Sequence, residues 1–228
     1  MIELGIAVAA LLAAGQAPLP PLLPEPERGV AVVLHPVSGR VHVHPDGVRR
    51  YRRLLATSRV PVGTTVDAQE GRVRLVAASD DDGGTWTAEF AAGKFTVTQP
   101  AEGAPVVTLR LTGPSEEDAC TDADAAAAGR GKGKRVRRLW GDGHGRFRTS
   151  GRYSAATVRG TKWLTEDRCD GTLTRVVRGA VEVEDFTAEP PPDDTPREPP
   201  PGAVPAPGAE TTTVVVPAGR SYVARPQG

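Results

Sequence analysis

The sequence predicts an all-β protein, an antiparallel β-sandwich or β-roll of many short strands. The 228 residues include 26 glycines and 22 prolines, which favours sheets and turns over helices. Short segments alternate between apolar and polar residues, and turn signals separate them roughly every 8–12 residues. No long run of leucine, alanine, glutamate and lysine has helical spacing. The length is sufficient for one large domain or two small ones.

Alternation and turn residues locate the expected strands. In the first half they are residues 30–34, 39–44, 64–66, 72–76, 85–90, 94–98 and 106–111. In the second half they are residues 145–149, 154–158, 161–165, 172–177 and 180–186. The glycine-rich residues 141–145 are expected to form a tight hairpin loop, because they lead into a strand rather than a helix.

The composition shifts along the chain predict its organisation. The expected segments are a signal peptide at 1–17, a proline-rich linker at 18–29, a β domain at 30–186, a proline-rich disordered insertion at 187–210 and a closing β-hairpin of the same domain at 211–224. The β domain divides into a first half at 30–112, a solvated loop at 113–138 and a second half at 139–186.

The N-terminus favours export. Residues 4–15 are apolar, and Gly15, Gln16 and Ala17 form a small-x-small cleavage site. The apolar run is shorter than the roughly 20 residues of a membrane span, so no stable transmembrane span is expected. The segment before it contains Glu3 and lacks lysine and arginine, which leaves open an alanine-rich helix of a cytosolic protein.

Cys120 and Cys169 are the two cysteines, and neither has the spacing of a metal site. In a reducing compartment they would be buried free thiols. In an oxidising compartment they would form a disulfide that closes a loop of about 49 residues and contributes roughly 3–4 kcal/mol. Because export is expected, so is the disulfide.

Charge patterning gives one candidate site. The chain has 28 basic and 28 acidic residues, so its net charge favours neither nucleic acid nor a membrane surface. Residues 130–159, however, hold ten basic residues against one acid and interleave Trp140, Phe147 and Tyr153. Such a stretch can bind phosphates, stacked bases or an anionic wall polymer. The alternative is a surface loop balanced by the acidic residues 116–124. The candidate anion-binding residues are Arg130, Lys132, Lys134, Arg135, Arg137 and Arg138.

The sequence contains no nucleophile elbow, zinc-protease or P-loop motif, so we expect no enzyme activity, no cofactor and no metal. His42 and His44 share one strand face and could supply two metal ligands, but no third ligand is evident. Residues 80–82 are acidic, yet no calcium-loop spacing surrounds them, which favours a plain loop.

Glycines mark the expected structural turns of the second half. Gly160, which precedes Thr161, permits a bulge or a close backbone approach. Asp170 and Gly171 predict a hairpin turn, and Gly179 is expected to turn a corner of the roll.

Strand alternation puts Trp163 either inside, with Thr161 and Thr165, or outside. We expect it inside, because its bulk can fill much of a small β core. The other expected core residues are Leu164, Val158, Val176, Val181, Val183, Phe95, Val97, Leu109 and Leu111.

Several of these features together resemble a FecR-type domain. They are the step from Ala156 through Val158 to Gly160 and Thr161, the turn after it, and the strand that enters Gly179, Val181 and Val183. Residues 38–43, 61–75 and 215–219 resemble the opening and closing segments of that family, so the resemblance covers most of 37–224 in scattered pieces. Residues 138–143 and 160–171 are also similar to a repeated module of large exported actinobacterial proteins.

The resemblance implies a non-catalytic extracytoplasmic module that acts by interaction, sensing or scaffolding in the cell envelope. It supplies no catalytic residues. The expected partner is an envelope protein or polymer rather than nucleic acid. The alternative function is polyanion binding, to a cell-wall polymer or a nucleic acid, through residues 130–159.

Overall fold

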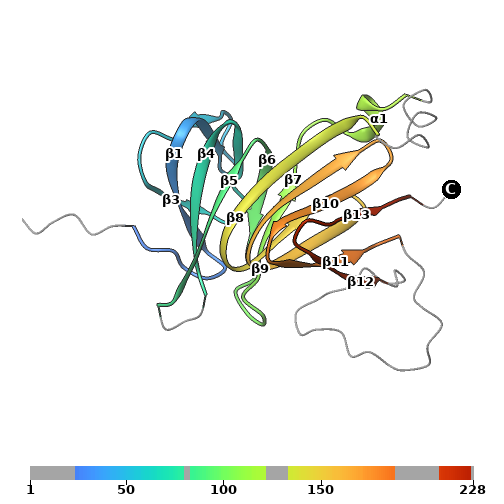
Figure 1. The fold of residues 1–228 in the computed structure, drawn as a ribbon. Helices are drawn as coiled ribbons and strands as arrows, with labels where there is room; N and C mark the ends of the chain where they lie inside the picture. The colour runs from blue at the N-terminus through green and yellow to red at the C-terminus, as the bar shows by residue number, and fades with distance from the viewer. Residues whose placement is uncertain (1–23, 80–82, 122–132, 188–210, 227–228) are drawn as a thin grey trace, which may run out of the picture.

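The computed structural model describes residues 24–79, 83–121, 133–187 and 211–226, and in these it is almost entirely β-sheet (Figure 1). The strands of the first half are β1 (Ala31–His44), β2 (Arg52–Arg53), β3 (Ser58–Pro61), β4 (Thr65–Ala78), β5 (Thr85–Ala91), β6 (Lys94–Thr98) and β7 (Val107–Leu111). A short helix follows, α1 (Glu116–Ala119). The later strands are β8 (Arg135–Ser150), β9 (Ser154–Arg168), β10 (Gly171–Arg178), β11 (Ala180–Asp185), β12 (Thr212–Pro217) and β13 (Ser221–Ala224).

The predicted all-β class is confirmed, and part of the sheet closes into a small barrel. Strand β4 pairs with both β5 and β6, β6 pairs with β7, and β8 pairs with both β5 and β7, so these five strands form a ring. Every strand pair of the described sheet is antiparallel except β7 with β8, which is parallel. The expected antiparallel sheet thus contains one parallel pair.

Four strands are much longer than the sequence predicts. β1 and β4 have 14 residues each, β8 has 16 and β9 has 15, and each includes residues that lie outside the strands we expected. The glycine-rich residues 141–145 lie inside β8 rather than in a loop, because β5 and β9 both pair with them. β8 also begins at Arg135, so residues 135–138 of the expected loop are strand.

Two glycines bend the second half as expected. The register of β8 against β9 shifts next to Gly160, whose φ is 69°, and Gly179 separates β10 from β11 at a φ of 79°. A side chain on Gly179 would press against the methyl group of Thr161, so the two turns meet at one corner. β10 pairs with the end of β9, and β11 pairs with its start.

The expected closing hairpin is wrong. β12 pairs with β11, and β13 pairs with β10. Since β10 and β11 follow one another along β9, β12 and β13 follow one another along the same outer edge. The hairpin between β9 and β10 is confirmed, with Cys169 and Asp170 as its turn and Gly171 as the first residue of β10.

One core fills the space within the rolled sheet. Trp163 is completely buried, and so are its strand neighbours Thr161 and Thr165, so the inward orientation that we expected is confirmed. Its indole packs edge-on against Phe90, with 6.0 Å between the ring centroids, and Phe90 also contacts Phe95 and Phe147. The remaining expected core residues are all buried.

The segments expected at the ends of the domain are only partly described. Residues 1–23 and 188–210, which include the expected signal peptide and most of the proline-rich insertion, lie outside the described residues. Glu27, in the expected linker, forms an isolated bridge with Ala31 and an ion pair with Arg59, so this part of the linker is attached to the sheet. No helix in the described ranges is long and apolar enough to cross a membrane.

Candidate anion-binding site

A cavity of about 290 Å³ opens beside the start of β8, and four of the residues that line it are basic. They are Lys94 of β6 and Arg135, Arg137 and Arg138 of β8. The other lining residues are Gln69, Ala92, Gly93, Thr112, Pro114 and Val136. No acidic residue is among them, so the cavity concentrates positive charge.

The turn between β5 and β6 forms one wall and fixes the position of Lys94. Ala92 has a φ of 59°, which is uncommon for a residue other than glycine. Hydrogen bonds from Ala92 N to Ala68 O and from Ala68 N to Gly93 O hold the turn against β4. A side chain on Gly93 would overlap the carbonyl oxygen of Arg138, so the turn packs directly on the β8 backbone. This close approach places Lys94 next to the arginines of β8.

A buried carboxylate positions Arg137. Asp167 is completely buried, and its Oδ2 accepts a hydrogen bond of 2.8 Å from Arg137 Nε. Its Oδ1 accepts hydrogen bonds from Thr172 Oγ1 and from the backbone N–H of Arg152. Both carboxylate oxygens are thus satisfied, as a buried charge requires. Arg137 consequently has a structural role, and its charge is already partly neutralised.

A second carboxylate stabilises the turn that carries Cys169. Asp170 accepts two hydrogen bonds of 2.7 Å from Arg168 and one of 3.1 Å from Arg225. Burial alone would raise the pKa of this carboxyl. The hydrogen bonds and positive charges of the two arginines outweigh burial and lower the pKa below its ordinary value of 3.8.

The disulfide between Cys120 and Cys169 is present and attaches the α1 segment beside this turn. Cys169 N donates a hydrogen bond to Lys134 O, and Lys134 Nζ donates one to Ala119 O. Pro114, at the start of the attached segment, lines the cavity, and its carbonyl oxygen lies 3.5 Å from Arg137 Nη1. The disulfide therefore helps to hold one wall of the cavity in place.

Lys94, Arg135 and Arg138 form no ion pair with the described residues, in contrast to Arg137. Arg138 lies opposite Glu166 in the register of β8 and β9, and Lys94 lies opposite Asp67 in that of β6 and β4. Neither pair reaches ion-pair distance. No carboxylate of the described residues therefore neutralises these three positive charges, and Lys94 Nζ lies over the ring of Tyr51. Thr112, which also lines the cavity, has an Oγ1 atom that is buried without a hydrogen-bond partner in the described part of the chain.

The basic stretch 130–159 does not form a single patch. Arg130 and Lys132 lie outside the described residues. Phe147 is buried in the core, so it cannot stack with a base. Arg148 is paired with Glu184, and Arg152 with Glu117. Alternation along β8 sends neighbouring side chains to opposite faces. Of the described residues in the stretch, those that line the cavity are 135–138, at the start of β8.

Sequence reasoning missed two contributions to this region. The first is Lys94, which is separated from the basic stretch in the chain. The second is the arginine segment, which we define as Arg49, Arg50, Tyr51, Arg52 and Arg53. Its four arginines are exposed, and no hydrogen bond or ion pair of their side chains is found within the described ranges. A count of local charge along the sequence would have identified this segment.

His42 and His44, the described residues that we weighed for metal binding, do not belong to a group of metal-ligating side chains. His44 stacks on Tyr51, with 4.7 Å between the ring centroids. The described residues contain no group of three or more His, Cys, Asp or Glu side chains arranged to hold a metal. The acidic residues 80–82 lie outside the described residues.

Comparison with known proteins adds no assignment. No protein-family model, no curated protein and no solved structure matches this chain.

Proposed function

We propose that this protein is a non-catalytic interaction module of the cell envelope that binds the anionic groups of its partner in the cavity beside β8. The observation that carries the proposal is that Lys94, Arg135 and Arg138 all line one concave site that has no acidic lining residue. Arginine guanidinium groups match the geometry of phosphate and carboxylate oxygens, and a concave site strengthens the local field.

The cavity argues for binding rather than catalysis. Its lining offers positive charges, one hydroxyl, one amide and backbone, and it includes no histidine, carboxylate or cysteine that could act as a base or nucleophile. Arginine and lysine can hold an oxyanion, but this set provides no group that accepts a proton near neutral pH.

An extracytoplasmic location and a FecR-type architecture are part of the same proposal. The disulfide supports the location, because disulfides persist in oxidising compartments and are rare in the cytosol. Cell fractionation tests it: the mature chain is expected in the envelope or the medium with its two cysteines bonded. Recovery of the chain in the cytosol with free thiols would contradict the location.

Anion binding is tested by titrating the purified protein with tripolyphosphate at about 0.15 M salt, where exposed charges farther apart than about 8 Å are screened. We expect saturable binding that a variant with Lys94→Ala, Arg135→Ala and Arg138→Ala loses. Arg137 is left intact because its removal would leave Asp167 buried and unpaired.

The matched control is a variant with Arg159→Ala, Arg175→Ala and Arg220→Ala, which removes the same charge from exposed positions elsewhere. It should bind like the unchanged protein. If tripolyphosphate bound equally weakly to both variants, net charge alone would explain the loss, and the cavity would not be the binding site.

A further inference from the structure

We infer that the anionic partner is a linear polymer of oxyanions without nucleobases, which extends from the cavity beside β8 across the sheet to the arginine segment. This inference rests on the proposed function and specifies the class of its ligand. It depends on where the fold places the arginine segment relative to Lys94, which the sequence does not show.

The arginine segment adjoins the cavity through Tyr51. Lys94 lines the cavity, and its Nζ also lies 4.5 Å from the centroid of the Tyr51 ring. Tyr51 stands between Arg50 and Arg52 in the chain, and its ring stacks on His44 of β1. One lysine thus touches both the cavity and the arginine segment.

The register of the sheet aligns the same two regions on its outer face. Arg53 of β2 lies opposite His42 of β1, His42 lies opposite Asp67 of β4, and Asp67 lies opposite Lys94 of β6. The flanking residues Val41, Val43, Val66, Ala68 and Phe95 are buried, so this row faces outward. Three strand spacings separate Arg53 from Lys94, or about 14 Å.

The distance from the cavity to the arginine segment favours a polymeric ligand over a single anion. A single phosphate can occupy the cavity but cannot reach Arg53, whereas a flexible polymer can contact both. The arginine segment offers four exposed charges that the described residues leave unneutralised, and nearby Asp67 is the one acidic residue in the row. Each contact between a basic side chain and a polyanion charge releases counterions and adds to the affinity.

The aromatic residues argue against a nucleic acid. Proteins that bind single strands without sequence preference stack the bases on free aromatic faces. Along this surface the aromatic residue is Tyr51, and its ring is already engaged by His44 and Lys94. Phe147 of the basic stretch is buried. The surface therefore fits a charged backbone rather than bases.

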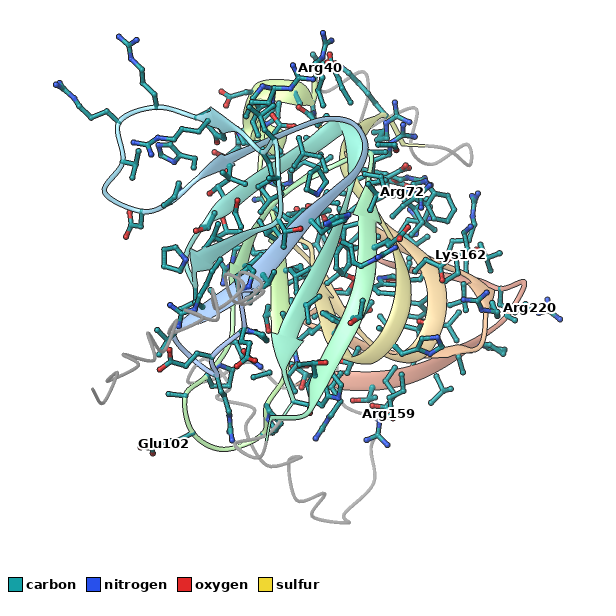
Figure 2. All side chains as sticks on the ribbon, turned by 90° about the vertical axis from the view of Figure 1, so that its left-hand side faces the viewer. Arg40, Arg72, Glu102, Arg159, Lys162 and Arg220 are labelled. Atoms are coloured by element: carbon teal, nitrogen blue, oxygen red, sulfur yellow. A yellow bond between two sulfur atoms is a disulfide. The ribbon has the colours of Figure 1, made fainter. Side chains whose placement is uncertain are left out.

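The arginine segment also lies far from the positions of the control variant. In Figure 2 the light-blue loop that follows β1 projects at the upper left, whereas Arg159 lies near the bottom and Arg220 at the right. Charge removed at those positions therefore tests net charge without altering the surface between the cavity and the arginine segment.

The experiment compares long-chain polyphosphate with tripolyphosphate for three proteins: the unchanged chain, a variant with Arg49→Ala, Arg50→Ala and Arg53→Ala, and the control variant with Arg159→Ala, Arg175→Ala and Arg220→Ala. We expect the long chain to bind the unchanged protein at least about tenfold more tightly than tripolyphosphate. The arginine-segment variant should lose that advantage and keep its tripolyphosphate affinity. Its slope of log affinity against log salt should fall by about 2, at about 0.7 for each lost contact with a flexible chain.

Four outcomes overturn the inference. The first is that the unchanged protein binds long-chain polyphosphate and tripolyphosphate with equal affinity. That result would contradict the extended surface but not the proposed anion binding in the cavity. The second is an equal loss in the control variant. The third is tighter binding of single-stranded DNA than of polyphosphate of equal charge. The fourth is capture by anionic phospholipid vesicles that Leu55→Ser abolishes, since Leu55 is 78% exposed beside the arginine segment and would then insert into lipid. If neither polyphosphate binds, the proposed function fails as well.

Discussion

Two groups of arginines in this protein differ in what surrounds them. Near the turn between β9 and β10, Arg137 and Arg168 are held by the buried carboxylates of Asp167 and Asp170, at hydrogen-bond distances of 2.7–2.8 Å. In the arginine segment, four arginines on an edge of the sheet are exposed, and the described residues provide them with no carboxylate. We call the first group the paired cluster.

The comparison shows that arginine content alone does not identify a binding surface. A buried ion pair stabilises the fold only while both partners are present, because removal of one leaves an uncompensated charge. An exposed arginine contributes little to stability and keeps its charge for a partner. The paired cluster should therefore be sensitive to mutation through stability, and the arginine segment through binding.

The largest effect is expected from the disulfide, which joins the paired cluster to the α1 segment. A variant with Cys120→Ser and Cys169→Ser should lose roughly 3–4 kcal/mol of unfolding free energy, because a closed loop of about 49 residues regains its entropy in the unfolded chain. Urea denaturation measures this loss. The unchanged protein in reducing agent should unfold at the same urea concentration as the variant, and a loss below about 1 kcal/mol would contradict the expectation.

The next effect tests the paired cluster directly. Asp170→Asn should lower the free energy of unfolding by about 3 kcal/mol, because Arg168, which is buried, would lose its charged partner. Glu102→Gln is the control: Glu102 is exposed at the lower left of Figure 2, and its change should stay within about 0.5 kcal/mol. If both substitutions changed the free energy of unfolding equally, burial of Asp170 would not make its charge more important for stability than an exposed charge.

The contribution of the Asp170 carboxylate to the free energy of unfolding should depend on pH, and the direction follows from its lowered pKa. The folded state lowers the pKa of Asp170 below 3.8, so the unfolded chain binds this proton more tightly. The carboxylate therefore stabilises the fold above the unfolded pKa, and this stabilisation is lost as the pH falls through the lowered folded pKa. The difference in unfolding free energy between the unchanged protein and the Asp170→Asn variant should be constant from about pH 5 to 7 and shrink below about pH 4. A difference that persists at lower pH would contradict this assignment.

The smallest effect on stability is expected from substitutions in the arginine segment. The variant with Arg49→Ala, Arg50→Ala and Arg53→Ala should unfold within about 0.5 kcal/mol of the unchanged protein, because these side chains make no contact that the described fold depends on. Thermal unfolding followed by circular dichroism measures it. A loss above about 1 kcal/mol would give the arginine segment a structural role and weaken its case as a binding surface.

Much of the fold was predictable from local pattern. Alternation gave the two faces of each strand, because side chains of a strand point alternately to its two sides. The bulk of Trp163 then indicated which face of its strand is buried. The turn signals at Asp170 with Gly171 and at Gly179 are equally local. Three features were not predicted: the long strands, the parallel pairing of β7 with β8, and the outer edge formed by β12 and β13. Each depends on which strands become neighbours, and these strands are separated in the chain.

The candidate site was only half predictable for the same reason. Residues 135–138 were identified because their charges are consecutive in the chain. Lys94 was not, because only the tertiary structure packs the turn before β6 on the β8 backbone. The charge of the arginine segment is visible in the sequence, but its place beside Lys94 depends on the pairing of β2, β1, β4 and β6. The sequence by itself determined the all-β class, the alternating core and, with two cysteines, the only internal pair that could form. The tertiary structure decided which arginines are neutralised by buried carboxylates and which remain exposed, because ion pairing depends on distances between strands that are far apart in the chain.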